Sequence, residues 1–185
     1  MDIVKKKTYG YVERDEKKRK IFQEKISLID PTKIIYLDEA GINDDEVYQY
    51  GWSKKGSRLY GMKKGSKSKR LSMIGGLCQN KILASLVFEG SCTRSVFEVY
   101  IEKILVPKLK PGNVIVLDNA AFHHGGNIKK LIENAQCELL YLPAYSPDLN
   151  PIEHWWALIK NKIKRILNLN SSDLYDATVM TLAMV

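Results

Sequence analysis

Three acidic residues, Asp38, Asp118 and Glu153, are spaced so that the chain could assemble a cluster of carboxylates. Asp38 and Asp118 each end a run of largely β-branched apolar residues, at 33–38 (KIIYLD) and 113–118 (NVIVLD). Such runs are typical of central parallel strands, and ligands collect beyond the carboxyl ends of those strands. Carboxylates that converge there offer the hard oxygen ligands that Mg²⁺ or Mn²⁺ prefers. The pattern predicts phosphoryl transfer on a nucleic acid with two metal ions.

Glu153 lies at the start of a predicted helix, and two interpretations of it stay open. Asn150 is a suitable N-cap and Pro151 suits the first helical position, so Glu153 falls at the third. An acid there can complement the helix dipole or return a hydrogen bond to the cap, which would make it structural. Alternatively it is the third metal ligand. The helix continues with an apolar face made of Ile152, Trp155, Trp156, Ile159, Ile163 and Ile166.

Composition is that of a single domain with its own core. The chain has 185 residues, of which 45% are hydrophobic. The first residues, MDIVKKK, lack the apolar stretch of a secretory signal, and no apolar run reaches membrane-spanning length. We therefore expect a soluble, cytoplasmic protein with no membrane partner. The three cysteines have no Cys-x-x-Cys spacing, which argues against a disulfide framework or a zinc site.

The positive charge is concentrated in one segment. The formal net charge is +8, and residues 54–70 hold eight cations and no acid, so the rest of the chain is balanced. Small residues and two aromatic ones, Trp52 and Tyr60, lie within or beside this segment, which suits a loop that follows a phosphate backbone. An ordinary solvated lysine loop is the alternative. The candidate DNA-binding residues are Lys54, Lys55, Arg58, Lys63, Lys64, Lys67, Lys69 and Arg70.

The order of predicted elements favours an α/β fold. A first helix precedes three or four strands, and helix, strand, helix, strand and helix follow. Strand 33–38 is expected to end at Glu39 to Gly41, and Gly75-Gly76 indicates a bulge. This layout is the ribonuclease-H-like mixed sheet flanked by helices. The expected helices are 14–29, 94–105, 127–135, 151–166 and 172–184, and the expected strands are 33–38, 46–53, 70–79, 81–89, 113–118 and 138–142.

Three segments carry a resemblance to a known family. YLDEAG at 36–41, VLDNAAFH at 116–123 and LPAYSPDLNPIEHWWALIK at 142–160 resemble the acidic motifs of DDE transposases of the mariner-type superfamily, in its bacterial insertion-sequence branch. Thirty-four residues separate Asp118 from Glu153, a spacing similar to the DD34E pattern of that branch. The resemblance extends over roughly residues 10–168, and its third motif is the most specific.

The resemblance implies a set of roles. Asp38, Asp118 and Glu153 would hold two Mg²⁺ or Mn²⁺ ions, with Asp38 bridging them. The chain would cut double-stranded DNA at transposon ends and join the freed 3′-hydroxyl to target DNA, in the nucleoid of a bacterial cell. His124 stands where many relatives have a lysine. Three further residues would lie beside the ligands, as supports, DNA contacts or ordinary loop residues: Asn119, His123 and His154.

The start of the chain departs from the family pattern. Such transposases carry paired helix-turn-helix modules before the catalytic domain, whereas residues 1–32 offer one helix, so we divide the chain into a helical lead-in (1–32) and a catalytic domain (33–185). A split or frameshifted gene, a decayed copy or an artificial boundary would each explain this. We expect a homodimer or a partner chain that carries the end-recognition domain. The alternatives are a catalytically idle DNA-binding remnant and a ribonuclease H or Holliday-junction nuclease that hydrolyses without joining.

Overall fold

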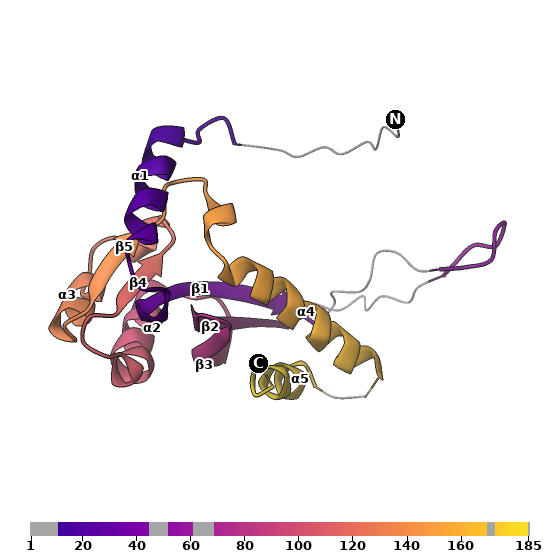
Figure 1. Cartoon of the computed structure of the whole chain (residues 1–185). Helices are drawn as coiled ribbons and strands as arrows, with labels where there is room; N and C mark the ends of the chain where they lie inside the picture. The colour runs from indigo at the N-terminus through magenta and orange to yellow at the C-terminus, as the bar shows by residue number, and fades with distance from the viewer. Residues whose placement is uncertain (1–10, 45–51, 61–68, 170–172, 185) are drawn as a thin grey trace, which may run out of the picture.

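A mixed five-stranded sheet forms the centre of the molecule (Figure 1). The computed structural model describes residues 11–44, 52–60, 69–169 and 173–184. The strands lie in the order β3-β2-β1-β4-β5; β1, β4 and β5 are parallel, and β2 is antiparallel to β1 and β3. Most of the expected strand 46–53 lies outside the described residues. The strands are β1 (Ile34–Asn43), β2 (Arg70–Cys78), β3 (Lys81–Glu89), β4 (Val114–Leu117) and β5 (Glu138–Tyr141).

In the described part of the chain, five α-helices lie against the sheet, and their order agrees with the predicted one. The expected helix 94–105 is divided, because α2 ends at Tyr100 and a π-helical turn follows from Ile101 to Leu105. The Thr93 hydroxyl accepts a hydrogen bond from the Val96 N–H at 3.4 Å and so caps α2 as expected. The helices are α1 (Glu16–Ser27), α2 (Arg94–Tyr100), α3 (Ile128–Asn134), α4 (Ile152–Leu169) and α5 (Leu174–Leu182).

The two faces of the sheet have separate apolar cores. One face packs against α2 and α3, where Phe97 and Ile128 are fully buried. The other packs against α4 and α5, where Trp156 and Ile159 lie against β1 and β2. Successive residues of a strand point to opposite faces, so neighbours on β1 contribute to different cores. α1 adds a third cluster in which Phe22 packs with Ile34, Val116 and Leu142. The division of the chain at residue 32 remains a prediction.

The first strand is longer than predicted. Glu39 to Gly41 do not end it, because β1 continues to Asn43. The sequence prediction was wrong here because β2 pairs with β1 along the whole of Tyr36 to Asn43, and that ladder stabilises the strand beyond its apolar run. Asp38 therefore lies within β1 and not at its end.

The expected bulge at Gly75-Gly76 is present, as a shift in the pairing of β2 with β3 between Ile74 and Gly76. Gly75 lies opposite Asp38 in the antiparallel ladder. A side chain at Gly75 would start 3.2 Å from the indole of Trp156, so the glycine makes room for that ring against the sheet. The bulged strand thus brings a helix side chain beside Asp38.

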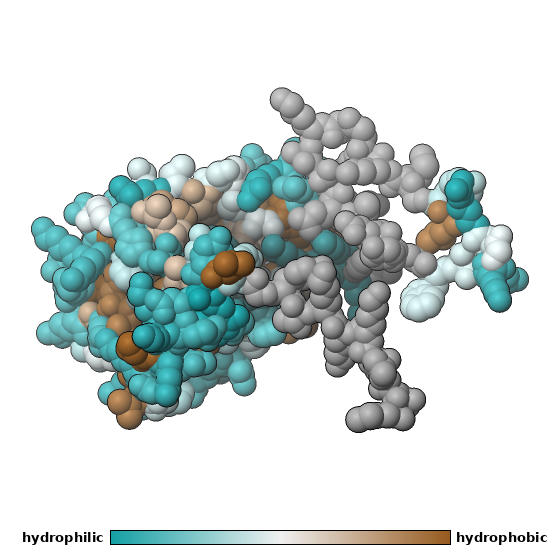
Figure 2. All heavy atoms as spheres, turned by 90° about the horizontal axis from the view of Figure 1, so that it is seen from above, coloured by the Kyte–Doolittle hydropathy of each residue, from teal (hydrophilic) through white to brown (hydrophobic). Residues whose placement is uncertain are grey.

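The face of the molecule seen from above is mostly hydrophilic where it is coloured in Figure 2. Figure 2 shows hydrophobic side chains scattered among hydrophilic ones on the face seen from above, and residues 52–60 stand apart from the main body in that view. Among the described helices, none combines the length and the apolar character needed to cross a membrane.

Candidate active site

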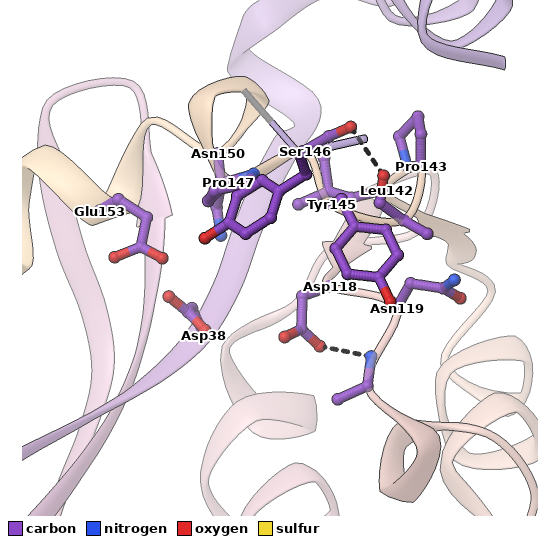
Figure 3. A pocket seen from close by; sticks show the side chains of 13 residues that line it. Asp38, Asp118, Asn119, Leu142, Pro143, Tyr145, Ser146, Pro147, Asn150 and Glu153 are labelled. Carbon is purple, nitrogen blue, oxygen red and sulfur yellow. Dashed lines mark hydrogen bonds between the residues drawn. The ribbon is translucent and has the colours of Figure 1, made fainter. Parts of the chain in front are cut away.

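The structure brings Asp38, Asp118 and Glu153 to one pocket. Tyr36 pairs with Val116 in the parallel ladder of β1 and β4. Asp38 and Asp118 each follow two residues later, so they lie side by side along the strand direction. Glu153 approaches from the first turn of α4. Figure 3 shows the Asp38 carboxylate between those of Glu153 and Asp118, and all three border the same space.

The pocket has a volume of about 500 Å³. Its wall opposite the two aspartates is the loop between β5 and α4, and its rim includes Tyr11 from the segment before α1. The rings of Tyr11 and Tyr145 lie 5.5 Å apart, so the start of the described chain meets that loop directly. The lining residues are Tyr11, Asp38, Asp118, Asn119, Ala120, Leu142, Pro143, Ala144, Tyr145, Ser146, Pro147, Asn150 and Glu153.

Asp38 is buried and anchored through one oxygen. The indole N–H of Trp156 donates to Asp38 Oδ2 at 3.2 Å. Burial, followed by the charges of Glu39 and Glu153, raises the pKa of Asp38 to about 8. Part of this shift comes from the neighbouring acids, and that part would be relieved by a positive charge in the pocket. Within the described residues, however, no three acidic, histidine or cysteine side chains form a compact metal cluster.

Asp118 is anchored through Oδ1 by two neighbours. The Ala120 N–H donates to Oδ1 at 3.0 Å, and His123 Nδ1 lies 2.5 Å from the same oxygen. Burial opposes ionisation of Asp118, but the hydrogen bonds from His123 and Ala120 outweigh it and lower the pKa of the carboxyl group. The two aspartates therefore differ, since Asp118 is held in the charged form and Asp38 is not.

His123 lies behind Asp118 with no exposed surface. Its Nε2 is 2.8 Å from Oε1 of Glu39, so each ring nitrogen faces a carboxylate. Burial works against the charged ring, yet the hydrogen bonds to Asp118 and Glu39 raise the pKa of His123 to about 9. A protonated imidazole donates to both acids and reduces the negative charge next to the pocket.

Glu153 is exposed, in contrast to the buried Asp38. Its carboxylate accepts no hydrogen bond from any described residue, so the capping-box alternative finds no support in the side-chain contacts. The predicted side-chain cap is wrong: Asn150 is buried at 3% exposure, and its Oδ1 lacks a partner within the described chain. Only the Asn150 carbonyl participates, accepting from the Glu153 N–H at 3.3 Å. α4 begins at Ile152.

The remaining predicted residues are distributed around the pocket. Asn119 is on its wall and its Oδ1 lies 2.6 Å from His124 Nε2, whose ring stacks on Tyr141 at 4.3 Å. His154 is exposed and does not line the pocket. Five of the eight predicted DNA-binding residues are exposed, namely Lys54, Lys55, Arg58, Lys69 and Arg70. The other three, Lys63, Lys64 and Lys67, lie outside the described residues.

Sequence reasoning missed three features that hold the pocket together. Trp156 was assigned only to the apolar face of its helix, although a buried indole N–H usually needs an acceptor. Glu39 was taken as the end of a strand, yet two consecutive acids on a strand point to opposite faces, and the one on the covered face must find a partner. The third feature, a contact between α1 and Asp148, joins residues too far apart in sequence for any local pattern to reveal.

That contact fixes the loop before Glu153. The guanidinium of Arg19, whose side chain is 6% exposed, donates to both oxygens of Asp148 at 3.1 and 2.7 Å, and Arg14 donates to Oδ2 at 3.0 Å. Such forked contacts are directional as well as charged. α1 and the loop from β5 to α4 are thereby joined on the side of the pocket rim.

We expect Asp148→Asn to lower the free energy of unfolding by about 1–2 kcal/mol at pH 7, since it leaves the guanidinium of Arg19 poorly paired. The hydrogen bond from Arg19 lowers the pKa of Asp148, so this stabilisation is present above the ordinary pKa of 3.8 and is lost as the pH falls through the lower, folded value. Urea unfolding at pH 7 and below pH 4 measures both effects, with Glu13→Gln as the control. Equal stability of variant and wild type at pH 7 would show that the ion pair contributes nothing.

Comparison with known proteins identifies what this arrangement resembles. Residues 33–174 match the family model described as DDE superfamily endonuclease. The transposase of the transposable element Tcb1 from Caenorhabditis briggsae is 31% identical over 87 residues, which are 45% of this chain and 32% of that protein.

Solved structures support the fold. The chain resembles the Mos1 strand transfer complex with a TM-score of 0.65 at 17% identity, covering 86% of this chain and 52% of that one. The Mos1 mariner paired end complex with Mn has a TM-score of 0.64 at 15% identity, and the match covers 97% of this chain and 63% of that one. The catalytic core domain of BIV integrase has a TM-score of 0.50 at 11% identity, and the match covers 82% of this chain and 81% of that one. The predicted ribonuclease-H-like mixed sheet flanked by helices is confirmed, whereas the chain spans only part of its transposase relatives.

Proposed function

Because the chain belongs to the DDE superfamily of endonucleases, we propose that it cuts and joins DNA strands at the pocket lined by Asp38, Asp118 and Glu153. One observation carries the proposal: three acids from separate elements, each within a motif of the family, line a single pocket. The relatives are transposases of transposable elements, and we propose the corresponding substrate here, which is double-stranded transposon ends and target DNA. Membership of the bacterial insertion-sequence branch is also proposed. It rests on the DD34E spacing alone, because the Tcb1 and Tcb2 transposases come from the nematode Caenorhabditis briggsae.

The donor set of the pocket suits Mg²⁺ or Mn²⁺. All three side chains offer carboxylate oxygens. Burial, and after it the charges of Glu39 and Glu153, raises the pKa of Asp38, and a cation would offset the part that comes from those charges. A bound divalent ion would supply activation of the attacking oxygen and neutralisation of charge at the scissile phosphate, and two such ions are proposed. One relative was solved as a complex with Mn and another with Mg.

Other residues of the chain orient the three acids or bind the DNA. Trp156 holds Oδ2 of Asp38, and Ala120 and His123 hold Oδ1 of Asp118, so Oδ2 of Asp118 is left for the pocket. Glu153 completes the set from α4 without a hydrogen bond that would restrict its carboxylate. The exposed cations of residues 54–70 bind the DNA backbone and bring a phosphate to the pocket.

A strand-joining assay tests this proposal. Incubated with Mn²⁺, supercoiled plasmid and a labelled oligonucleotide that ends in a 3′-hydroxyl, the chain should nick the plasmid and link the label to it. Removal of the ion with EDTA should abolish both products, and Glu153→Gln serves as the inactive control. Nicking without joining would favour the ribonuclease-H-like nuclease, and DNA binding without either product would favour the idle remnant. The partner chain or second copy that would supply end recognition is not needed for this unspecific reaction.

A further inference from the structure

Glu39 is an acid that the proposed reaction does not use. It follows Asp38 on β1 but points to the other face of the sheet, toward α2 and α3. Its side chain is only 15% exposed, and its Oε1 lies 2.8 Å from Nε2 of His123. A carboxylate seldom lies in such surroundings unless it is paired. Its partner, His123, contacts Asp118.

His123 is fixed on every side. The ring is fully buried, with the rings of Phe97 and Phe122 at 4.6 and 4.1 Å between centroids. Its carbonyl accepts a hydrogen bond from the Tyr141 hydroxyl at 2.9 Å. Arg94 on α2 binds the surrounding turn by donating to the carbonyls of Ala121, Phe122 and His124. Because the ring cannot move freely, the contact with Glu39 at one nitrogen helps to fix the other nitrogen against Asp118.

The contacts of Asp118 are divided between its two oxygens. Oδ1 receives the Ala120 N–H and the His123 ring, whereas Oδ2 has no hydrogen bond from any residue in the described part of the chain. The carboxylate can therefore keep Oδ1 anchored while Oδ2 faces the pocket. Without the His123 contact, one backbone N–H would remain, and rotation of the group would be less restricted.

We propose that Glu39 is a positioning residue which, through His123, orients Asp118 so that Oδ2 is presented to a divalent cation. This rests on the proposed function, because it assumes that the pocket binds such an ion. Ligands of a metal depend on the hydrogen bonds that orient them, and loss of such a partner typically lowers metal affinity about 10–100-fold. The competing explanation is that Glu39 and His123 are a buried pair that only stabilises the fold.

Mn²⁺ binding to the 185-residue chain separates these explanations. We expect Glu39→Gln to weaken Mn²⁺ binding by about 10–100-fold, measured by the electron paramagnetic resonance signal of free Mn²⁺ during titration. Glu98→Gln is the matched control. Glu98 accepts the Asn127 N–H at 2.9 Å and so supports the same connection between β4 and α3, but it makes no contact with His123. Its substitution should leave Mn²⁺ affinity unchanged.

A second pair of variants covers the possibility that Glu39→Gln does not fold. The amide nitrogen of asparagine can take the place of Nδ1, so His123→Asn keeps a donor to Asp118 while His123→Ala removes it. Mn²⁺ should therefore bind more tightly to His123→Asn than to His123→Ala. The melting temperature of each variant is measured as well, to show that both are folded.

Three outcomes would overturn the proposal. Wild-type affinity in Glu39→Gln would show that Glu39 does not orient the ligand, and an equal loss in Glu98→Gln would show that only the rigidity of the loop matters. Equal affinity of the two His123 variants would remove the role of the Nδ1 contact. If the wild type binds no Mn²⁺, the proposed function fails together with this inference. Binding that is lost in Asp118→Asn but kept in Glu39→Gln refutes the inference alone.

Discussion

Asp38→Asn should abolish strand cleavage and, at the same time, make the metal-free protein more stable at pH 8. Asparagine keeps an oxygen that can accept the Trp156 N–H, but it removes the charge that a divalent cation requires. Loss of a ligand from the pocket should therefore eliminate Mn²⁺-dependent nicking and joining. The gain in stability has a separate cause, which is the unfavourable ionisation of Asp38 in the folded chain.

The sign of the stability change follows from the pKa of Asp38, which is raised from 3.8 to about 8. The folded state holds this proton more tightly than the unfolded state, so the free energy of unfolding falls as the pH rises from about 4 to about 8. The loss is at most about 1.4 kcal/mol for each pH unit. Asparagine does not titrate, so the advantage of the variant should be small near pH 4 and should reach several kcal/mol at pH 8.

Urea unfolding in EDTA at pH 5, 6.5 and 8 measures this advantage, and repetition with Mn²⁺ measures the ligand role. Mn²⁺ should stabilise the wild type, because a ligand that binds only the folded state shifts the unfolding equilibrium, and it should not stabilise Asp38→Asn. Asp173→Asn, at the exposed N-cap of α5, controls for substitution of an aspartate far from the pocket. A variant that is no more stable than the wild type at pH 8 would show that Asp38 ionises freely in the folded protein.

The sequence predicted the parts of the site that depend on local pattern. The β-branched run before Asp118 predicted a buried strand, and β4 ends at Leu117 with its four residues buried. Asn150, Pro151 and the apolar face after them correctly predicted where the helix of Glu153 begins, to within one residue. Such features depend on neighbours in the chain, so periodicity and turn residues are sufficient to find them.

The contacts that orient the acids were not predictable in the same way. Trp156 reaches Asp38 only because Gly75, on a third element, leaves space for the indole. Glu39 meets His123 across 84 positions of sequence, and Arg19 meets Asp148 across 129. Pairings of that range are set by the order and register of the strands, which a single sequence does not encode in any local signal. The same reason explains the error at Glu39 to Gly41, where the partner strand decided the length of β1.

The basic segment provides the second large effect, because three of its cations are exposed on residues 52–60. In Figure 2 these residues lie apart from the main body. We expect the chain to bind duplex DNA weakly and with little sequence preference, since phosphate contacts position a protein without specifying a sequence. Engagement of about half of the eight cations of residues 54–70 would give a slope of log K against log[salt] near −4.

Substitution of Lys54, Lys55 and Arg58 by alanine should flatten that slope by as much as roughly 2.7, because each phosphate that is neutralised contributes about 0.9. The fold should be unaffected, since these side chains are exposed. Fluorescence anisotropy with one duplex between 50 and 300 mM salt measures the slope. The control substitutes Lys108, Lys110 and Lys130, which are also exposed but lie outside the pocket and the basic segment, and removes the same charge.

Equal slopes for the two triple variants would mean that only net charge matters and that residues 52–60 are an ordinary solvated loop. If the slope is unchanged in both triple variants, DNA binds at another surface of the protein, and the basic residues of α4 would be the next to test. Those residues lie on the helix that carries Glu153. Their substitution would then have to flatten the slope without weakening Mn²⁺ binding. They are Lys160, Lys162, Lys164 and Arg165.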